Sequence, residues 1–98
     1  PEQMLAAAMS SCHMQTFLAL AAKKRLIVES YHDDAEAVLA QREDGKFYIA
    51  TLILRPRVQF GGDKVPDQAA IDAMHGKAHE HCFVANSVLS EVVLEPVY

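Results

Sequence analysis

The sequence has few of the residues that mark specialised small proteins: it contains no tryptophan, two cysteines, four glycines and four prolines. Two cysteines are too few for a disulfide-stapled scaffold, so the thiols are either core side chains or reactive groups. The low glycine and proline content, together with 51% hydrophobic residues, excludes a collagen-like or disordered chain. We therefore expect one globular domain over residues 1–98, with a thin core that favours oligomerisation.

Basic residues are also scarce. Nine Lys and Arg stand against 13 Asp and Glu, which gives a formal net charge of −4. Nucleic acids and anionic membranes are bound through basic surfaces, so we expect no nucleic-acid partner and no membrane partner. No stretch has the pattern of a secretory signal peptide, and we expect a cytoplasmic protein. Because the first residue is Pro1 rather than Met, we expect the chain to begin inside a longer protein.

The segment from Gln3 to Ala22 contains no charged residue and is apolar on nearly every side of a helix. This pattern predicts a central, buried helix. It begins after Pro1 and Glu2 and ends in the basic run 23–25, which suit the two ends of a helix. The segment is long enough to span a membrane, but polar residues at its centre argue against that: Ser10, Ser11, His13, Gln15 and Thr16.

Alternation of residue types predicts a long strand from Leu26 to Gln41, with a possible interruption at Asp33-Asp34. An Asp-Gly turn within 42–46 returns the chain into a second strand, from Phe47 to about Phe60. Pro56 lacks a ladder donor and predicts an edge or a bulge there. One face of the returning strand should pack on the helix: Tyr48, Ala50, Leu52, Leu54, Val58 and Phe60.

A second helix is predicted to open at Pro66-Asp67 and to end before the break at Asn86-Ser87. Its buried face would hold Ile71, Met74, Ala78 and Cys82. A last strand follows over 88–94. The element order α-β-β-α-β predicts an α+β fold in which the central helix packs on an antiparallel sheet.

The two cysteines lie on these two helices. Cys12 sits about three turns into the first, where burial should raise the pKa of its thiol and leave it inert. Cys82 ends the second helix beside the break. Each alone is more often a core residue. Together they could meet in so small a domain, and a thiol that attacks plus a thiol that resolves is the minimal equipment of a thiol peroxidase.

Two other clusters carry weaker signals. His75, His79, His81 and Cys82 have the residue types of a zinc site, but no Glu follows the first His and His81 points to another face. We expect these histidines on a solvated helix face, with no metal and no cofactor. Arg55 and Arg57 could form a small anion site, although charges that protect a strand edge explain them equally well.

Three segments resemble the OsmC/Ohr family of osmotically inducible and organic hydroperoxide resistance proteins. Pro1–His13 resembles its first-cysteine helix, Lys77–Ser87 its second-cysteine region, and Leu54–Val58 one of its strands. The resemblance implies an intertwined α+β homodimer with the two long helices at its centre. It also implies a thiol peroxidase of oxidative stress defence that reduces organic hydroperoxides to alcohols.

In that family role, Cys12 would be the peroxidatic thiol, which becomes a sulfenic acid, and Cys82 the resolving thiol, which forms a disulfide with it. A thiol or dithiol reductant would complete the cycle. Glu2 matches the family's Pro-Glu-Gln glutamate, which orients a catalytic arginine. An apolar lining from Leu5, Met9, Phe17 and Phe83 would favour bulky organic peroxides.

One departure from the family concerns that arginine, which lies upstream of the Pro-Glu motif together with the N-terminal strands. The arginines present here are not at matching positions, so we expect this chain to be impaired as a peroxidase. Glu2 and Cys12 are about 15 Å apart along one helix, so Glu2 would serve the partner's site across a two-fold axis. The alternative is a non-catalytic dimeric α+β module whose cysteines are core residues.

Overall fold

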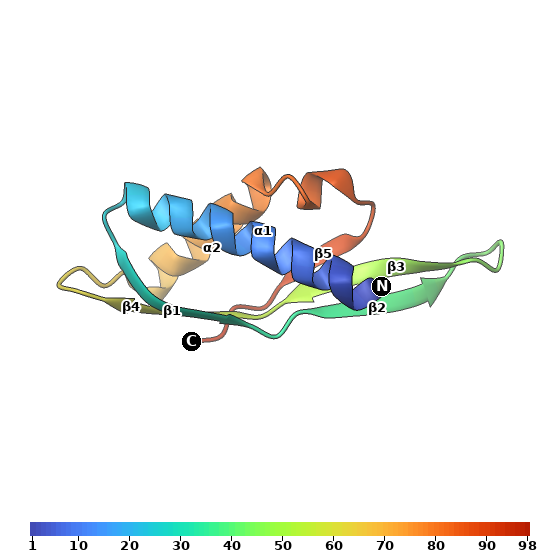
Figure 1. Ribbon diagram of the computed structural model, residues 1–98, viewed down its shortest axis with the longest axis horizontal. Coiled ribbons are helices and arrows are strands. Elements are labelled where there is room, and N and C mark those ends of the chain that lie inside the picture. The colour runs from blue at the N-terminus through green and yellow to red at the C-terminus, as the bar shows by residue number, and fades with distance from the viewer.

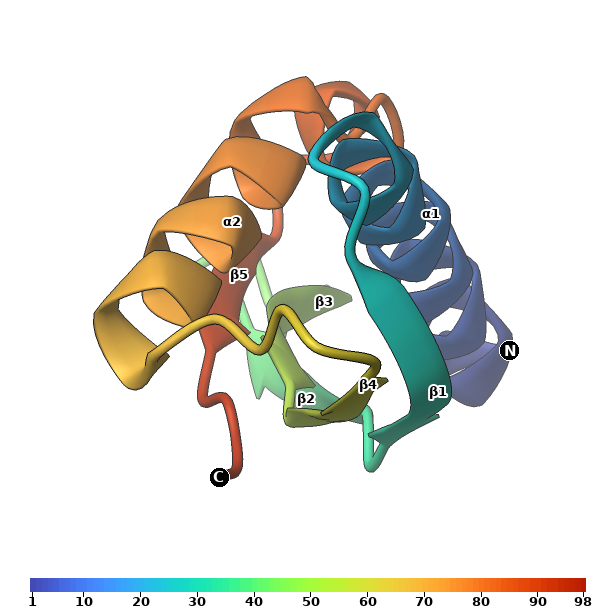
Figure 2. The ribbon, with the colours of Figure 1, turned by 90° about the vertical axis from the view of Figure 1, so that its left-hand side faces the viewer.

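The computed structural model describes all residues, 1–98, as an elongated body of 54 × 22 × 20 Å. Two helices lie on one side of the strands (Figures 1 and 2). The elements are α1 (Glu2–Lys23), β1 (Ile27–Asp33), β2 (Glu36–Gln41), β3 (Phe47–Leu54), β4 (Pro56–Gly61), α2 (Gln68–His81), the short 3-10 helix η1 (Ala85–Ser87) and β5 (Glu91–Leu94). The α+β class and the order of helices and strands are confirmed.

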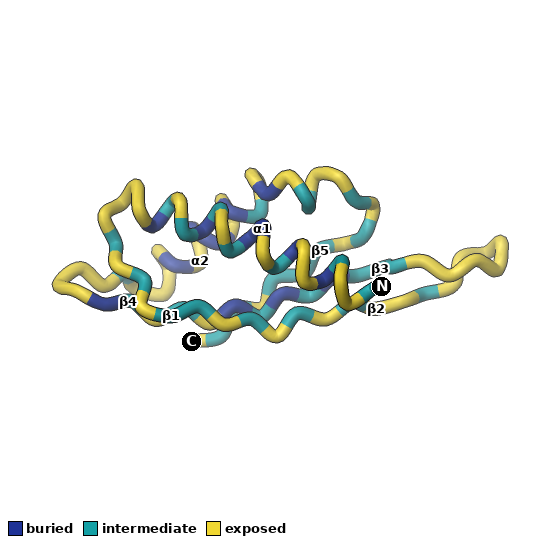
Figure 3. Tube along the Cα trace, in the orientation of Figure 1, coloured by how far each residue is buried: buried dark blue, intermediate teal, exposed yellow.

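Helix α1 forms where the sequence predicts it, with Glu2 in its first turn and Lys23 in its last. It ends because Arg25 adopts a left-handed conformation, with φ 59°, and the N–H of Leu26 donates to the carbonyl of Ala21. By length and composition α1 is also apolar enough to cross a membrane. Within one chain, the buried residues of α1 form a single stripe along one side of the helix, and the other side is exposed, for example at Met4. Buried and exposed positions therefore alternate along α1 in Figure 3. The buried residues are Ala6, Met9, Cys12, His13, Phe17 and Ala21.

The predicted long hairpin is present, but it is divided into two ribbons. Strands β1 and β4 pair antiparallel in one sheet, and β2 and β3 pair antiparallel in another. The expected interruption at Asp33-Asp34 is confirmed, and the returning strand is broken at Arg55. Pro56 opens β4 opposite Asp33, so the predicted irregularity at this proline is also confirmed.

The expectation of an antiparallel sheet is wrong for the last strand. β5 runs parallel to β3, with Thr51 paired to Glu91 and Leu54 paired to Leu94. A parallel neighbour needs a crossover connection, and α2 with the turn after it supplies one. The strand is also shorter than predicted, since it begins at Glu91 rather than Val88.

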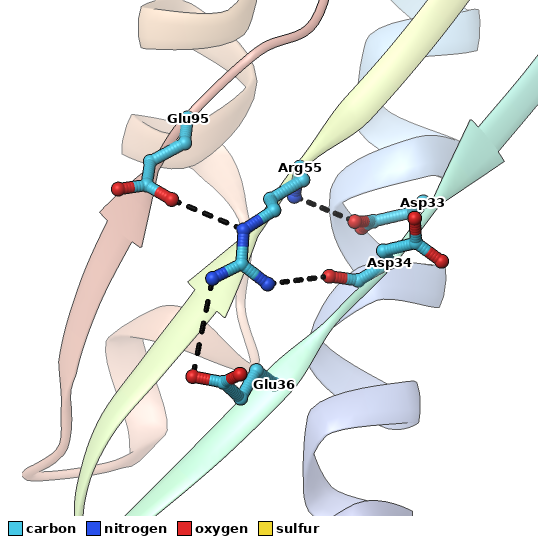
Figure 4. A network of polar contacts seen from close by, with 5 residues as sticks. All are labelled: Asp33, Asp34, Glu36, Arg55 and Glu95. Carbon is cyan, nitrogen blue, oxygen red and sulfur yellow. Dashed lines mark hydrogen bonds and ion pairs between the residues drawn. The ribbon is translucent and has the colours of Figure 1, made fainter.

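Arg55 holds the strands together at the point where both ribbons break (Figure 4). Its Nε donates to Glu95 Oε1 at 3.1 Å, and its Nη1 donates to the carbonyl of Asp34 at 3.2 Å. Its Nη2 lies 3.9 Å from a carboxylate oxygen of Glu36, and its backbone N–H donates to Asp33 Oδ1 at 2.6 Å. The guanidinium of Arg55 already contacts the carboxylates of Glu95 and Glu36, so Arg55 is not part of an anion site.

The core consists of two clusters along the length of α1. The first, which we call the thiol cluster, holds Ala6, Met9, Cys12, Leu52, Leu54 and Cys82. The second, the aromatic cluster, holds Phe17, Ala21, Ile71, Met74 and Ala78. The predicted buried face of α2 is therefore confirmed, and Asp67 caps this helix by accepting from the N–H of Ala70 at 2.8 Å. Of the predicted inner face of the strands, Leu52 and Leu54 are fully buried, whereas Tyr48 is exposed.

Candidate active site

The structure brings the two cysteines together. Cys12 comes from the middle of α1 and Cys82 from the C-cap of α2, and both belong to the thiol cluster. Both thiols are free and buried, with 5% and 1% of their surface exposed. Met9 lies on the same side of α1, with its sulfur 4.0 Å from that of Cys82. Sequence spacing left this proximity open, and the packing of α2 against α1 supplies it.

The turn after Cys82 brings backbone groups close to the sulfur of Cys12. Cys82 ends α2 because its backbone turns extended, at φ −73° and ψ 110°. The chain then folds into η1, held by the N–H of Asn86 donating to the carbonyl of Cys82. This turn directs the backbone N–H groups of Val84 and Phe83 at Cys12. The prediction that Cys82 ends the second helix is confirmed, since α2 ends at His81 with Cys82 as its C-cap.

These donors decide the acidity of Cys12. Burial raises the pKa of its thiol, but hydrogen bonds from the N–H of Val84, the Cys82 thiol, the N–H of Phe83 and the Thr16 hydroxyl together lower it more. The pKa of Cys12 therefore lies below its ordinary value. The expectation of a raised pKa is wrong, because hydrogen-bond donors can stabilise a thiolate without a cation. The expectation of an inert thiol stays a prediction.

Cys82 has the opposite tendency. Burial raises the pKa of this thiol, and its hydrogen bond to Cys12 raises it further, against weaker opposing donors from Ala85 and Val84. The pKa shifts of the two thiols therefore have opposite signs, and Cys12 is the more acidic of the pair.

Glu2 is not brought to this pair. It lies in the first turn of α1, ten residues before Cys12, at an open surface pocket of about 570 Å³. Ser10, Tyr31 and Asp33 line the same pocket, between α1 and the strands β1 and β2. The pKa of Glu2 is lowered chiefly by its own backbone N–H at the start of the helix. A role for Glu2 in the site stays a prediction.

The expected apolar lining is only partly present. Leu5 and Met9 pack within the thiol cluster around Cys12. Phe17 lies in the aromatic cluster instead, and Phe83 is 71% exposed. Phe17 was therefore wrongly assigned to the lining, because one helical face carries two successive clusters along its length.

The histidines differ most from expectation. His75 is buried rather than solvated, and its Nδ1 lies 3.0 Å from Nε2 of the buried His13 on α1. Phe17 stacks on His75 with ring centroids 4.4 Å apart. Burial lowers the pKa of both histidines to about 4, and for His13 the nearby His75 and His79 add to the effect, whereas Asp33 opposes it.

Sequence analysis missed this pair, although His75 follows Met74 on the predicted buried face and His13 follows Cys12. With its ring engaged by His13, His75 is not available to a zinc site with His79 and Cys82. No group of three or more His, Cys, Asp or Glu side chains is arranged to hold a metal ion.

Comparison with known proteins identifies the family and the fold. The model of the OsmC-like protein family matches residues 1–96. An OsmC-like protein of unknown function from Vibrio cholerae shares 47% sequence identity, with a TM-score of 0.95 over 99% of this chain. The chain spans 63% of that protein's length. No curated protein matches.

Two more distant structures share the fold. The organic hydroperoxide resistance protein OhrB of Bacillus subtilis has 23% identity and a TM-score of 0.82, over 99% of this chain and 69% of its own. An organic hydroperoxide resistance protein from Legionella pneumophila has 23% identity and a TM-score of 0.70. The similarity covers 98% of this chain and 66% of that protein. The chain belongs to the OsmC-like protein family, whose fold is also that of organic hydroperoxide resistance proteins.

Proposed function

We propose that this chain carries the two reactive thiols of a peroxidase that reduces organic hydroperoxides to alcohols. The observation that supports it most is that the two buried thiols lie in one cluster and have pKa shifts of opposite sign. A core in which two cysteines merely fill space does not require a turn that directs backbone donors at one of them.

The reaction follows from the two roles. The Cys12 thiolate attacks the distal oxygen of a hydroperoxide, the O–O bond breaks, and the alkoxide takes a proton and leaves as the alcohol. Cys12 is thereby oxidised to a sulfenic acid. The Cys82 sulfur then attacks the Cys12 sulfur and forms a disulfide, while its proton leaves with the hydroxyl group as water. A dithiol or two thiols reduce the disulfide by exchange and are themselves oxidised.

Because both sulfurs are buried, the hydroperoxide and the reductant need a way to reach them. Leu5 and Met9 give the Cys12 side an apolar surface, which favours an organic peroxide over hydrogen peroxide because apolar surface is buried on binding. The turn after Cys82 is exposed at Phe83 and Leu89, and opening of this turn would give a reductant access to the disulfide. The thiols supply both electrons, and the proposal needs no cofactor.

We place the protein in the cytoplasm, as a homodimer, and assign Glu2 to the site of the partner. A side of α1 that stays exposed and apolar in a single chain supports a dimer, because burial of such a surface stabilises association. The alternative function is a non-catalytic module, which the near-complete burial of both cysteines favours.

Measuring the consumption of an organic hydroperoxide in the presence of a dithiol reductant distinguishes the peroxidase from the non-catalytic module. The proposal predicts consumption of cumene hydroperoxide by the wild-type chain, loss of activity in Cys12→Ser and strong impairment in Cys82→Ser. Cys82→Ser is the matched control, since it removes the other buried thiol by the same chemical change. Consumption that is equal in all three proteins would support the non-catalytic module.

A further inference from the structure

A groove at the opposite end of α1 from Glu2 has no role in the chemistry above. It lies where the end of α1, the loop after β4 and the first turns of α2 meet, and Figure 2 views the molecule from this end. Its volume is about 450 Å³, within the range of small-molecule sites, about 300–1,000 Å³. The apolar lining residues are Leu20, Leu26, Val65, Pro66, Ala70, Ala73 and Met74.

Its remaining lining residues are all lysines: Lys24, Lys64 and Lys77. No carboxylate lines the groove, and none of the ion pairs in the structure involves a lysine. Lys64 instead donates to the backbone carbonyl of Lys24 at 3.1 Å, which holds two of the three together. Three lysines without an ion pair thus line one apolar groove in a chain of net charge −4.

The chemistry of the groove defines its ligand. An apolar interior takes an alkyl chain, since burial of methylene groups favours binding. The ammonium groups of the three lining lysines attract an anionic head group. The buried Met74 of the aromatic cluster is among the lining residues, and no residue of the thiol cluster lines the groove. The groove is therefore separate from the two sulfurs.

We propose that this groove binds a single-chain fatty acid as its free carboxylate. The alkyl chain of the acid lies between α1 and α2, and its carboxylate lies among Lys24, Lys64 and Lys77. The site is independent of the peroxidase reaction and binds the acid itself, with no peroxide group.

Isothermal titration with laurate, below its micelle concentration, tests the proposal on the whole chain. We expect one laurate per chain. Shortening the acid by two methylenes should weaken binding about tenfold, and acetate should not bind. The triple change Lys24→Gln, Lys64→Gln and Lys77→Gln should weaken laurate binding at least tenfold, as should Ala73→Trp, which fills the groove from an exposed position.

Matched controls locate the site. Lys46→Gln removes a lysine far from the groove, and Cys12→Ser removes the reactive thiol; both should bind laurate as the wild type does. The proposal is overturned if laurate fails to bind, if the triple variant binds it unchanged, or if Cys12→Ser abolishes binding. Equal affinity for dodecyltrimethylammonium, a cation with the same chain, also overturns it. If the proposed peroxidase function is wrong, the binding results stay as predicted here.

Discussion

Nε2 of His13 lies 3.0 Å from Nδ1 of His75, so two histidines from different helices share one hydrogen bond inside the core. Only one proton fits between the two nitrogens, and neither ring is exposed to water. Protonating either ring would place a charge beside its neighbour and beside Phe17, in a site that desolvates it. The pair therefore joins α1 to α2 in its neutral form.

The first prediction concerns the dependence of stability on pH. The folded pKa of both histidines is about 4, against 6.5 in the unfolded chain. Between these values the unfolded chain binds more protons, so the free energy of unfolding should fall as pH is lowered from about 6.5 towards 4, by up to roughly 3 kcal/mol for each histidine. Urea denaturation at pH 7.5 and pH 5 measures this loss.

The double variant His13→Leu with His75→Leu should lose much less stability between these pH values. His32→Gln changes an exposed histidine and should keep the wild-type pH dependence. An unaltered acid sensitivity in the double variant would show that other groups control the pH response.

The second prediction concerns the reactivity of Cys12. Because donors from the turn after α2 lower its pKa, alkylation of Cys12 by iodoacetamide in Cys82→Ser should already rise below the pH at which a free thiol, with a pKa of about 8.5, reacts. Alkylation of Cys82 in Cys12→Ser should need a higher pH, since burial raises its pKa. The measurement is the second-order rate at each pH. The same midpoint for both cysteines would refute the proposed asymmetry.

The third prediction concerns Arg55. Replacing it with Met keeps the aliphatic stem but removes the contacts to Glu36, Glu95 and the carbonyl of Asp34. Since the side chain is a third exposed, we expect a cost of about 1 kcal/mol, which would lower the melting temperature by about 4–8 °C. Arg57→Met is the control, because Arg57 is exposed and makes no ion pair. An equal fall in melting temperature in both variants would mean that the contacts of Arg55 do not stabilise the strands at this break.

The fourth prediction concerns Glu2. If it serves the partner's thiol, a heterodimer of Glu2→Ala and Cys12→Ser chains combines one intact Glu2 with one intact Cys12 in the same site. Peroxide consumption by such mixed dimers should reach about half of the wild-type rate. The unmixed Glu2→Ala and Cys12→Ser proteins provide the baseline. A mixed protein no more active than this baseline excludes action across the dimer.

Local chemistry accounts for the parts of the fold that the sequence predicts. The end of α1 in basic residues, the capping of α2 by Asp67 and its buried face depend on residues close together in the chain. The site depends on long-range placement. His13 and His75 are 62 residues apart, and nothing local to either shows that they meet. Burial raises the pKa of Cys12, and among the groups that lower it are backbone groups of a turn more than 70 residues later. The parallel direction of β5 depends on where α2 packs.

The most direct test of the two-thiol account is the intact mass of the protein under non-reducing conditions, after one equivalent of cumene hydroperoxide. The account predicts that the wild-type chain loses two hydrogen atoms as Cys12 and Cys82 form a disulfide. Cys82→Ser should instead gain one oxygen at Cys12, and Cys12→Ser should stay unchanged. An unchanged wild-type mass, or the same oxidation in Cys12→Ser, would contradict the assignment of Cys12 as the attacking thiol.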